Sequence, residues 1–331
     1  MNSRDQLDQL LKRNYDVLRD AECEAQVVNY LREKSTLLGE DPHFIKRLTK
    51  VASHILAKNP AALEGLVEKT YTFHIEGMKA LEEHPEAATR RNQIMHAHLS
   101  GHAATFADYL VRTMRDTNAQ RHWNIKKYEH HKFSADFELS LDDLQGAMHN
   151  YLGAAHAAID LAKNYACDNQ EKKQWGEAAL QMLDSALPLI PADNVPKKAE
   201  AYYSRATILH ALYRTFKEEI SFEENAIEAW GEAAEYAARY DSLYAAQLYL
   251  RAGNEAYGLR LKFTRGSKPN KRWSERSFRM YKLAERHCPE NNFEMAGEIN
   301  KRIHSMELEK SSKDKPLFLK GKRVKRKSNF Y

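Results

Sequence analysis

A short unit, Tyr-x-x-Ala, recurs at similar separations in the C-terminal half of the chain, and it constrains the fold more than any other feature. The unit begins at Tyr151, Tyr203 and Tyr249, at separations of 52 and 46 residues. Residues three apart lie on the same face of a helix. The recurrence therefore predicts an internal repeat of helical units with a period of 46–52 residues.

A second series of small residues falls between the copies of the first. It begins at Ala179, Ala226 and Ser277, at separations of 47 and 51 residues, and an alanine follows each start seven residues later. Small residues at fixed helical positions let two helices approach closely, and a larger aromatic side chain fills the space beside them. The two interleaved series predict stacked helical hairpins, because each hairpin leaves an apolar face that only its neighbour covers.

The composition favours the same all-α class. The 331 residues include only 13 glycines and 9 prolines, too few for a β-sandwich or barrel with a turn every 8–12 residues or so. With 43% hydrophobic and 29% charged residues, the chain is neither disordered overall nor a membrane protein. The expected hairpins pair 141–166 with 170–189, 196–216 with 221–238 and 241–263 with 270–288, and a capping helix over 291–309 covers the open end.

Three parts are expected along the chain. Residues 1–135 form an N-terminal bundle of about four helices. The stretch Phe133–Ser140 has no clear helical face, and the domain boundary is placed there. Residues 140–309 form the helical repeat domain, whose first helix Ser140 caps. Residues 310–331 form a flexible basic tail, because the apolar periodicity is lost there.

The stretch from Tyr240 to Gly253, Tyr-Asp-Ser-Leu-Tyr-Ala-Ala-Gln-Leu-Tyr-Leu-Arg-Ala-Gly, resembles the tetratricopeptide family and its longer-helix relatives of the SNAP type. The resemblance covers residues 141–309, with a period longer than the family's usual length of about 34 residues. It implies a tetratricopeptide-like α-solenoid that acts as a non-enzymatic scaffold and binds a peptide or helix of a protein partner on its concave face. It implies no catalysis, and no cofactor is expected.

Positive charge is concentrated at the C-terminal end. The chain has a net charge of +5, to which residues 259–286 and 310–331 contribute +8 each while residues 1–258 carry −8. A dipolar chain of this kind favours an anionic partner at its basic end, whether nucleic acid, an acidic protein surface or a phospholipid headgroup. RNA is our first expectation among these partners.

Lysines and arginines beside aromatic rings are typical of nucleic-acid surfaces, because the cations neutralise phosphates and the rings stack on bases. Trp273 is the aromatic candidate for exposure, whereas Phe278 falls in the repeat series and is expected in the core. The residues expected to bind RNA or another anion are Arg265, Lys268, Lys271, Arg272, Trp273, Arg276, Lys320, Lys322, Arg323, Lys325, Arg326 and Lys327.

The segment from Arg91 to His96 offers an enzymatic alternative. Arg91, Asn92 and His96 resemble the Arg-Asn-x-x-x-His ribonuclease motif of the HEPN family of small all-α domains. The resemblance implies a metal-independent ribonuclease in which His96 moves the ribose 2′-hydroxyl proton, Arg91 steadies phosphate charge and Asn92 orients them. This hypothesis stands beside that of the adaptor.

A metal site is the third candidate. His98 and His102 lie four residues apart on one expected helix face, a spacing that can hold one ion. No Glu follows His98 to make a His-Glu-x-x-His motif, and no third ligand stands at a fixed spacing from the pair. The sequence therefore makes these histidines a weak metal candidate.

The cysteines and the start of the chain bear on its compartment. Cys23, Cys167 and Cys288 lie far apart, as expected in a reducing compartment. The first residues lack the apolar run of a secretory signal, and no stretch approaches the length of a membrane-spanning helix. A cytoplasmic protein is expected, and in a nucleated cell Lys322–Lys325 matches a nuclear-import signal.

Overall fold

The structure is a computed structural model that describes residues 115–314, with side chains as far as Glu309, together with Tyr71, Ile75 and parts of a helical segment between Ser100 and Arg112. The chain divides into two compact units. The first comprises the residues up to 194 and 207–218, and the second comprises 195–206 and the residues from 219 onward. Most of the expected N-terminal bundle lies outside the described residues.

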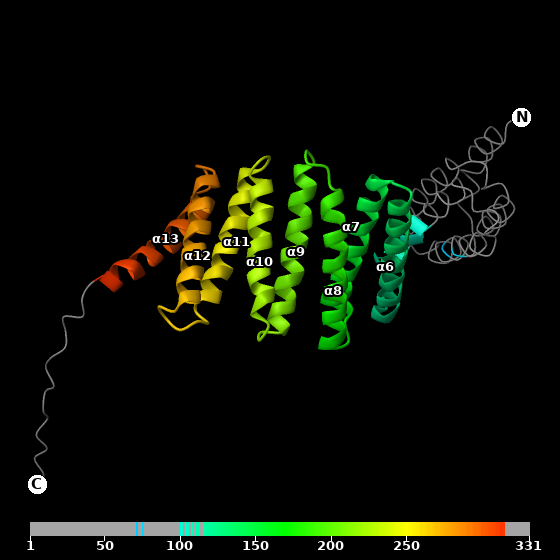
Figure 1. Cartoon of the computed structure of the whole chain (residues 1–331), viewed down its shortest axis with the longest axis horizontal. Helices are drawn as coiled ribbons and strands as arrows, with labels where there is room; N and C mark the ends of the chain where they lie inside the picture. Colours follow the sequence, from blue (N-terminus) through cyan, green and yellow to red (C-terminus); the bar gives the residue numbers. More distant parts are fainter. Residues whose placement is uncertain are drawn as a thin grey trace, which may run out of the picture. The chain divides into compact units, whose positions relative to one another are not determined.

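The first unit contains three successive helices joined by short turns (Figure 1). They are α6 (Thr117–Ser140), α7 (Leu144–Asp160) and α8 (Asn169–Ala186). A π-helical turn, η3 (Leu161–Tyr165), follows α7, and a 3-10 turn, η4 (Leu187–Leu189), follows α8. Helix α7 packs against both α6 and α8. Aspartate side chains cap the N-termini of these helices because they accept the backbone N–H groups that lack a helical partner, and these residues are Asp116, Asp143 and Asp168.

The second unit continues the pattern with α10 (Ile220–Ala237), α11 (Ser242–Arg260), α12 (Lys268–His287) and α13 (Phe293–Asp314). Each of these helices packs against the next one in the chain (Figure 1). Residues 195–206 of α9 (Val195–Thr215) also belong to this unit. Within the described residues no strand occurs, which confirms the expected all-α class and the arrangement of a helical repeat protein.

The bounds of the observed helices from Leu144 onward follow those of the expected helices closely, but three local predictions are wrong. Residues 133–140 are helical, because α6 runs through them and turns Ser134, Ala135 and Glu138 toward its packed face. Asp143 rather than Ser140 caps α7, and it accepts a hydrogen bond from the backbone N–H of Gly146 at 2.9 Å. Helix α13 extends to Asp314, into the segment expected to be flexible.

The small residues of both repeat series lie in the core. The alanine of each Tyr-x-x-Ala unit is completely buried, as are the alanines that close the second series. These residues are Ala154, Ala206 and Ala252 in the first series and Ala186, Ala233 and Ala284 in the second. Small side chains at these positions allow the helices to approach closely, as the sequence predicts.

The large residues beside them are buried as well. Leu183, Trp230 and Tyr281 occupy the same position in the three copies of the second series, and all three side chains have no exposed surface. Helices α11 and α12 pack closely where the ring of Tyr281 lies over Gly253. A Cβ atom on Gly253 would lie 2.7 Å from two ring carbons of Tyr281. The absence of a side chain at this glycine therefore sets the distance between the two helices.

A partly buried ion pair connects α11 to α13. The guanidinium of Arg260 donates hydrogen bonds of 2.8 and 3.3 Å to the carboxylate of Glu309. It also lies over the ring of Tyr257, with Cζ 4.2 Å from the ring centroid. Because Arg260 is buried, its charge requires these contacts, and they hold α13 against the end of the unit.

No helix in the described part of the chain is long and apolar enough to cross a membrane.

Replacing Gly253 by Ala is expected to destabilise the protein by about 1–3 kcal/mol, because the added methyl group overlaps the Tyr281 ring and the packed helices cannot easily move apart. The matched control is Gly258→Ala on the same helix, where a Cβ atom would meet nothing within 4 Å. There the higher helix propensity of alanine should raise the free energy of unfolding by up to about 1 kcal/mol. Urea unfolding of both variants tests this, and equal effects would contradict the packing argument.

Candidate anion-binding surface

Helix α12 is the most basic described helix, and local interactions fix where it starts. Ser267 caps it by accepting a hydrogen bond from the backbone N–H of Asn270 at 3.4 Å, and Pro269 stands in its first turn. The Asn270 side chain donates a hydrogen bond of 2.9 Å to the carbonyl oxygen of Arg260. The loop between α11 and α12 is therefore tied to both helices.

The two faces of α12 differ sharply in chemistry. The face toward the core holds Asn270, Trp273, Ser277, Met280, Tyr281 and Ala284. Six exposed basic residues lie on the opposite side, within a sector of about 100° for a helix that turns by about 100° per residue. We name them the α12 cation row: Lys268, Lys271, Arg272, Arg279, Lys282 and Arg286.

Few acidic groups offset this charge. Glu275 lies within the sector of the cation row, and Arg272 approaches Glu228 of α10 at 4.0 Å, with both side chains more than half exposed. Lys282 pairs with Glu285 at 3.1 Å one helical turn away. Exposed ion pairs of this kind contribute little and exchange readily for other partners. With seven Lys or Arg residues and two Glu, α12 keeps a net charge of +5.

The structure brings together most of the expected anion-binding residues that it describes. Lys268, Lys271 and Arg272 are exposed on the first turns of α12, and Arg265 is exposed in the loop before it. Arg276 is half-buried instead, since one of its terminal nitrogens lies 3.8 Å from the place that a Cβ atom on Gly231 would take. It therefore leans against α10 rather than out into solvent.

Trp273 does not belong to this surface. Its side chain is 1% exposed and packs in a core cluster with Ile227, Ala256 and Leu259. This corrects the expectation that Trp273 stacks on bases, because a buried ring offers no free face. The sequence held the signal, since Trp273 stands four residues before Ser277 of the buried repeat series.

The other candidate residues lie outside the described residues. These are Arg91, Asn92 and His96 of the ribonuclease motif, His98 and His102 of the metal candidate, and Lys320, Lys322, Arg323, Lys325, Arg326 and Lys327 of the basic tail. Their roles stay predictions.

A buried polar network in the first unit was not predicted from the sequence. The Ser100 hydroxyl donates to the carbonyl oxygen of His130 at 2.8 Å, so toward the ring Nδ1, 3.4 Å away, it can only accept. This geometry assigns the ring proton to Nδ1. Nε2 then accepts a hydrogen bond of 2.7 Å from the hydroxyl of Tyr71. Burial lowers the pKa of His130 to about 4 and raises the pKa of Tyr71.

The next residue extends the network between α6 and α7. Nδ1 of His131 donates to the side-chain oxygen of Asn150 at 2.8 Å, and the Asn150 amide donates to Glu138 at 2.7 Å and to Ser134 at 3.2 Å. Burial lowers the pKa of His131 to about 4 and raises the pKa of Glu138. Since the groups are enclosed and satisfy one another, the network holds helices together rather than binding a ligand.

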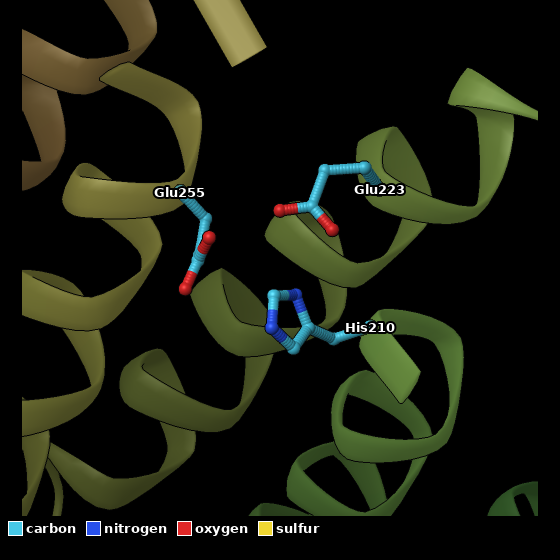
Figure 2. Close-up of side chains that lie close together, drawn as sticks. All are labelled: His210, Glu223 and Glu255. Carbon is cyan, nitrogen blue, oxygen red and sulfur yellow. The ribbon is translucent and has the colours of Figure 1, made fainter. Parts of the chain in front are cut away.

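A pair of acidic residues lies between α10 and α11 of the second unit. Glu223 is buried and Glu255 half-buried, and an oxygen of one carboxylate lies within 4.8 Å of an oxygen of the other. Figure 2 shows the two carboxyl groups approaching each other from the two helices; His210, also labelled there, belongs to the first unit. Two carboxylates are too few ligands to define a metal centre.

Comparisons with known proteins add little to this picture. No family model matches the chain, and no curated protein matches it. Among solved structures it is similar to a circular tandem repeat protein with a novel repeat topology and enhanced subunit contact surfaces. The identity is 15%, the match covers 93% of this chain and 73% of that one, and the TM-score is 0.36. At so low a TM-score the fold of this chain rests on its own helices.

Lowering the pH from 7 to 5 is expected to weaken the first unit. His130 titrates at about 4 when folded and at about 6.5 when unfolded, so the unfolded chain takes up its proton first and stability falls as the pH drops below about 6.5. The loss from His130 alone is about 2 kcal/mol at pH 5. Protonation also removes the Nε2 acceptor that binds Tyr71.

Hydrogen exchange of the α6 amides at the two pH values measures this effect. His130→Gln should reduce the pH dependence of the exchange, because it removes one titrating group. It should not abolish that dependence, because Glu138 and His131 remain. The exposed His304, changed to Gln, is the control and should leave the dependence as it is. An unchanged pH dependence in His130→Gln would contradict the assignment.

Proposed function

We propose that the chain is a non-enzymatic adaptor of tetratricopeptide-like architecture. Its basic C-terminal end holds an anionic partner, with RNA as the leading candidate, and its helical repeats bind a segment of a protein. The observation that carries this proposal is the α12 cation row, which places six exposed cations on one side of one helix. The proposed place of action is the cytoplasm, or the nucleus where Lys322–Lys325 acts as an import signal.

The charge of α12 supports an RNA partner for a physical reason. A cation that neutralises a phosphate releases a condensed counterion, so a surface with several such cations binds polyanions strongly at low salt. The acidic partners of the cation row are exposed and separate at little cost. Under this proposal the tail, with Lys320, Lys322 and Arg323 among its cations, adds further contacts to the same polyanion.

A tyrosine cluster in the second unit supports binding of a protein segment. The rings of Tyr202 and Tyr236 stack with centroids 5.6 Å apart, and Arg239 lies over the Tyr236 ring at 5.2 Å. Tyr240 and Leu243, in the turn between α10 and α11 and at the start of α11, are exposed. Tyrosine and arginine are enriched at protein interfaces, because they combine large apolar area with a polar end.

The alternative function is a metal-independent ribonuclease, which the motif at Arg91, Asn92 and His96 favours. The adaptor proposal expects single-stranded RNA to stay intact when it is incubated with the protein in EDTA. Cleavage by the wild-type chain that is lost in His96→Ala would establish the ribonuclease instead. Gel analysis of end-labelled RNA separates the two.

Removing two charges from the cation row is expected to weaken RNA binding and its salt dependence. In Arg272→Gln/Arg279→Gln, two phosphate contacts are lost, so the slope of log K against log salt concentration should become shallower by about 1.4 for single-stranded RNA. Fluorescence anisotropy of a labelled RNA over a range of salt concentrations measures the slope.

The matched control removes the same charge elsewhere. Lys163 and Lys217 are exposed in the first unit, and Lys163→Gln/Lys217→Gln should leave both affinity and slope close to wild type. If the two double variants behave alike, the cation row has no specific role in binding RNA.

A further inference from the structure

The α12 surface presents charge without free aromatic faces. This observation deepens the proposed function and rests on it. Four aromatic residues accompany the basic residues of the α11–α12 loop and of α12. Trp273 and Tyr281 are buried, and Phe263 is half-buried against the core cluster that contains Trp273. Phe278, the fourth, is half-buried as well.

The cations themselves cover two of these rings. Cζ of Arg272 lies 5.0 Å from the ring centroid of Trp273, and Nζ of Lys282 lies 5.9 Å from that of Phe278. Proteins that stack on single-stranded bases need an aromatic ring with an open face. At α12 the ring faces are turned into the core or lie beneath cations, so bases find no stacking platform on this helix.

The cation row is suited to binding the sugar–phosphate backbone of a nucleic acid instead. From Lys268 to Arg286 the helix extends for about 27 Å, at about 1.5 Å per residue. Long, flexible side chains project along this whole length, and the acidic Glu275 interrupts them near the middle. A linear series of cations can follow the phosphates of a nucleic-acid strand whatever its sequence, because the phosphate charge is the same at every nucleotide.

We propose that α12 binds the sugar–phosphate backbone of RNA and contacts no base. The partner is therefore RNA of any sequence, held by phosphate charge. An adaptor with this surface associates with RNA without choosing among sequences, and any choice of target comes from its protein partner.

The experiment compares two probes on two proteins. The probes are a single-stranded RNA of about 20 nucleotides, longer than the roughly 4–16 nucleotides that one OB fold covers, and an abasic strand with the same number of phosphates. The proteins are the full chain and Arg272→Gln/Arg279→Gln, each measured by anisotropy at the same salt concentrations. We expect the double substitution to weaken binding of both probes by the same factor, within about twofold.

For each probe, the ratio of the affinity of the full chain to that of the double variant reports the contribution of α12 without that of the tail. Aromatic residues in the tail can stack on bases and raise the affinity of the full chain for RNA, but that gain is present in both proteins and cancels. If the double substitution weakens RNA binding at least fivefold more than abasic binding, α12 contacts bases and the inference is wrong, while the proposed function stands. If neither probe binds, both the inference and the proposed RNA function fail.

A competition measurement tests the chemical class of the anion. Poly-glutamate with the same number of charges carries carboxylates in place of phosphodiesters. We expect it to displace the abasic strand at least tenfold less effectively than unlabelled RNA does. Equal displacement would overturn the assignment to a phosphate backbone and indicate an acidic protein as the partner.

Discussion

The close contact between small residues on successive helices is the constraint on which the rest of the structure depends. At Gly253 the neighbouring helix lies so near that the ring of Tyr281 occupies the space of a side chain. Completely buried alanines keep the side chains small elsewhere in the two repeat series, as at Ala206 and Ala233. Helices at this distance gain dispersion contacts along their whole length, and a single added methyl group disturbs many of them. The repeat in the sequence therefore reflects the need for small side chains wherever successive helices are in close contact.

The two units hold their helices together by different chemistry. Helices α6 and α7 meet through a hydrogen-bonded network around His130, His131 and Asn150, which requires these histidines to stay neutral. Helices α11 and α12 meet through apolar contacts and through hydrogen bonds donated by α12 side chains. Ser277 donates to the carbonyl oxygen of Gly253 at 2.8 Å, Asn270 to that of Arg260 at 2.9 Å, and the Tyr281 hydroxyl to the Asn254 side chain at 2.9 Å. Acid therefore weakens the contact between α6 and α7, because protonation of these two histidines is favoured in the unfolded chain.

Helix bounds were predictable from the sequence where several signals of the repeat agreed on them. The hydrogen-bond partners of individual side chains were harder to predict. The expected helix over 270–288 matches α12 because buried positions, a Ser267 cap and a proline all indicate the same start. The helix over residues 133–140 was not predicted because its buried face includes two polar side chains, Ser134 and Glu138. A search for apolar periodicity does not detect such a face. The partners of His130 could not be predicted, since Tyr71 and Ser100 are distant in the sequence and only the fold brings them together.

The rotation of α12 about its own axis couples the fold to the proposed function. Ser277, Met280 and Tyr281 belong to the repeat series, and their burial decides which side of the helix faces α11. That choice turns Trp273 inward and leaves Arg272 and Arg279 outward, because the two arginines are displaced from the tryptophan by about 100° and about 120° around a helix with about 3.6 residues per turn. The same buried residues that let the helices pack therefore also decide that the outer surface of α12 carries exposed positive charge while the Trp273 ring stays buried. A helix rotated by one residue would bury cations and expose the tryptophan, and the core could not accept it.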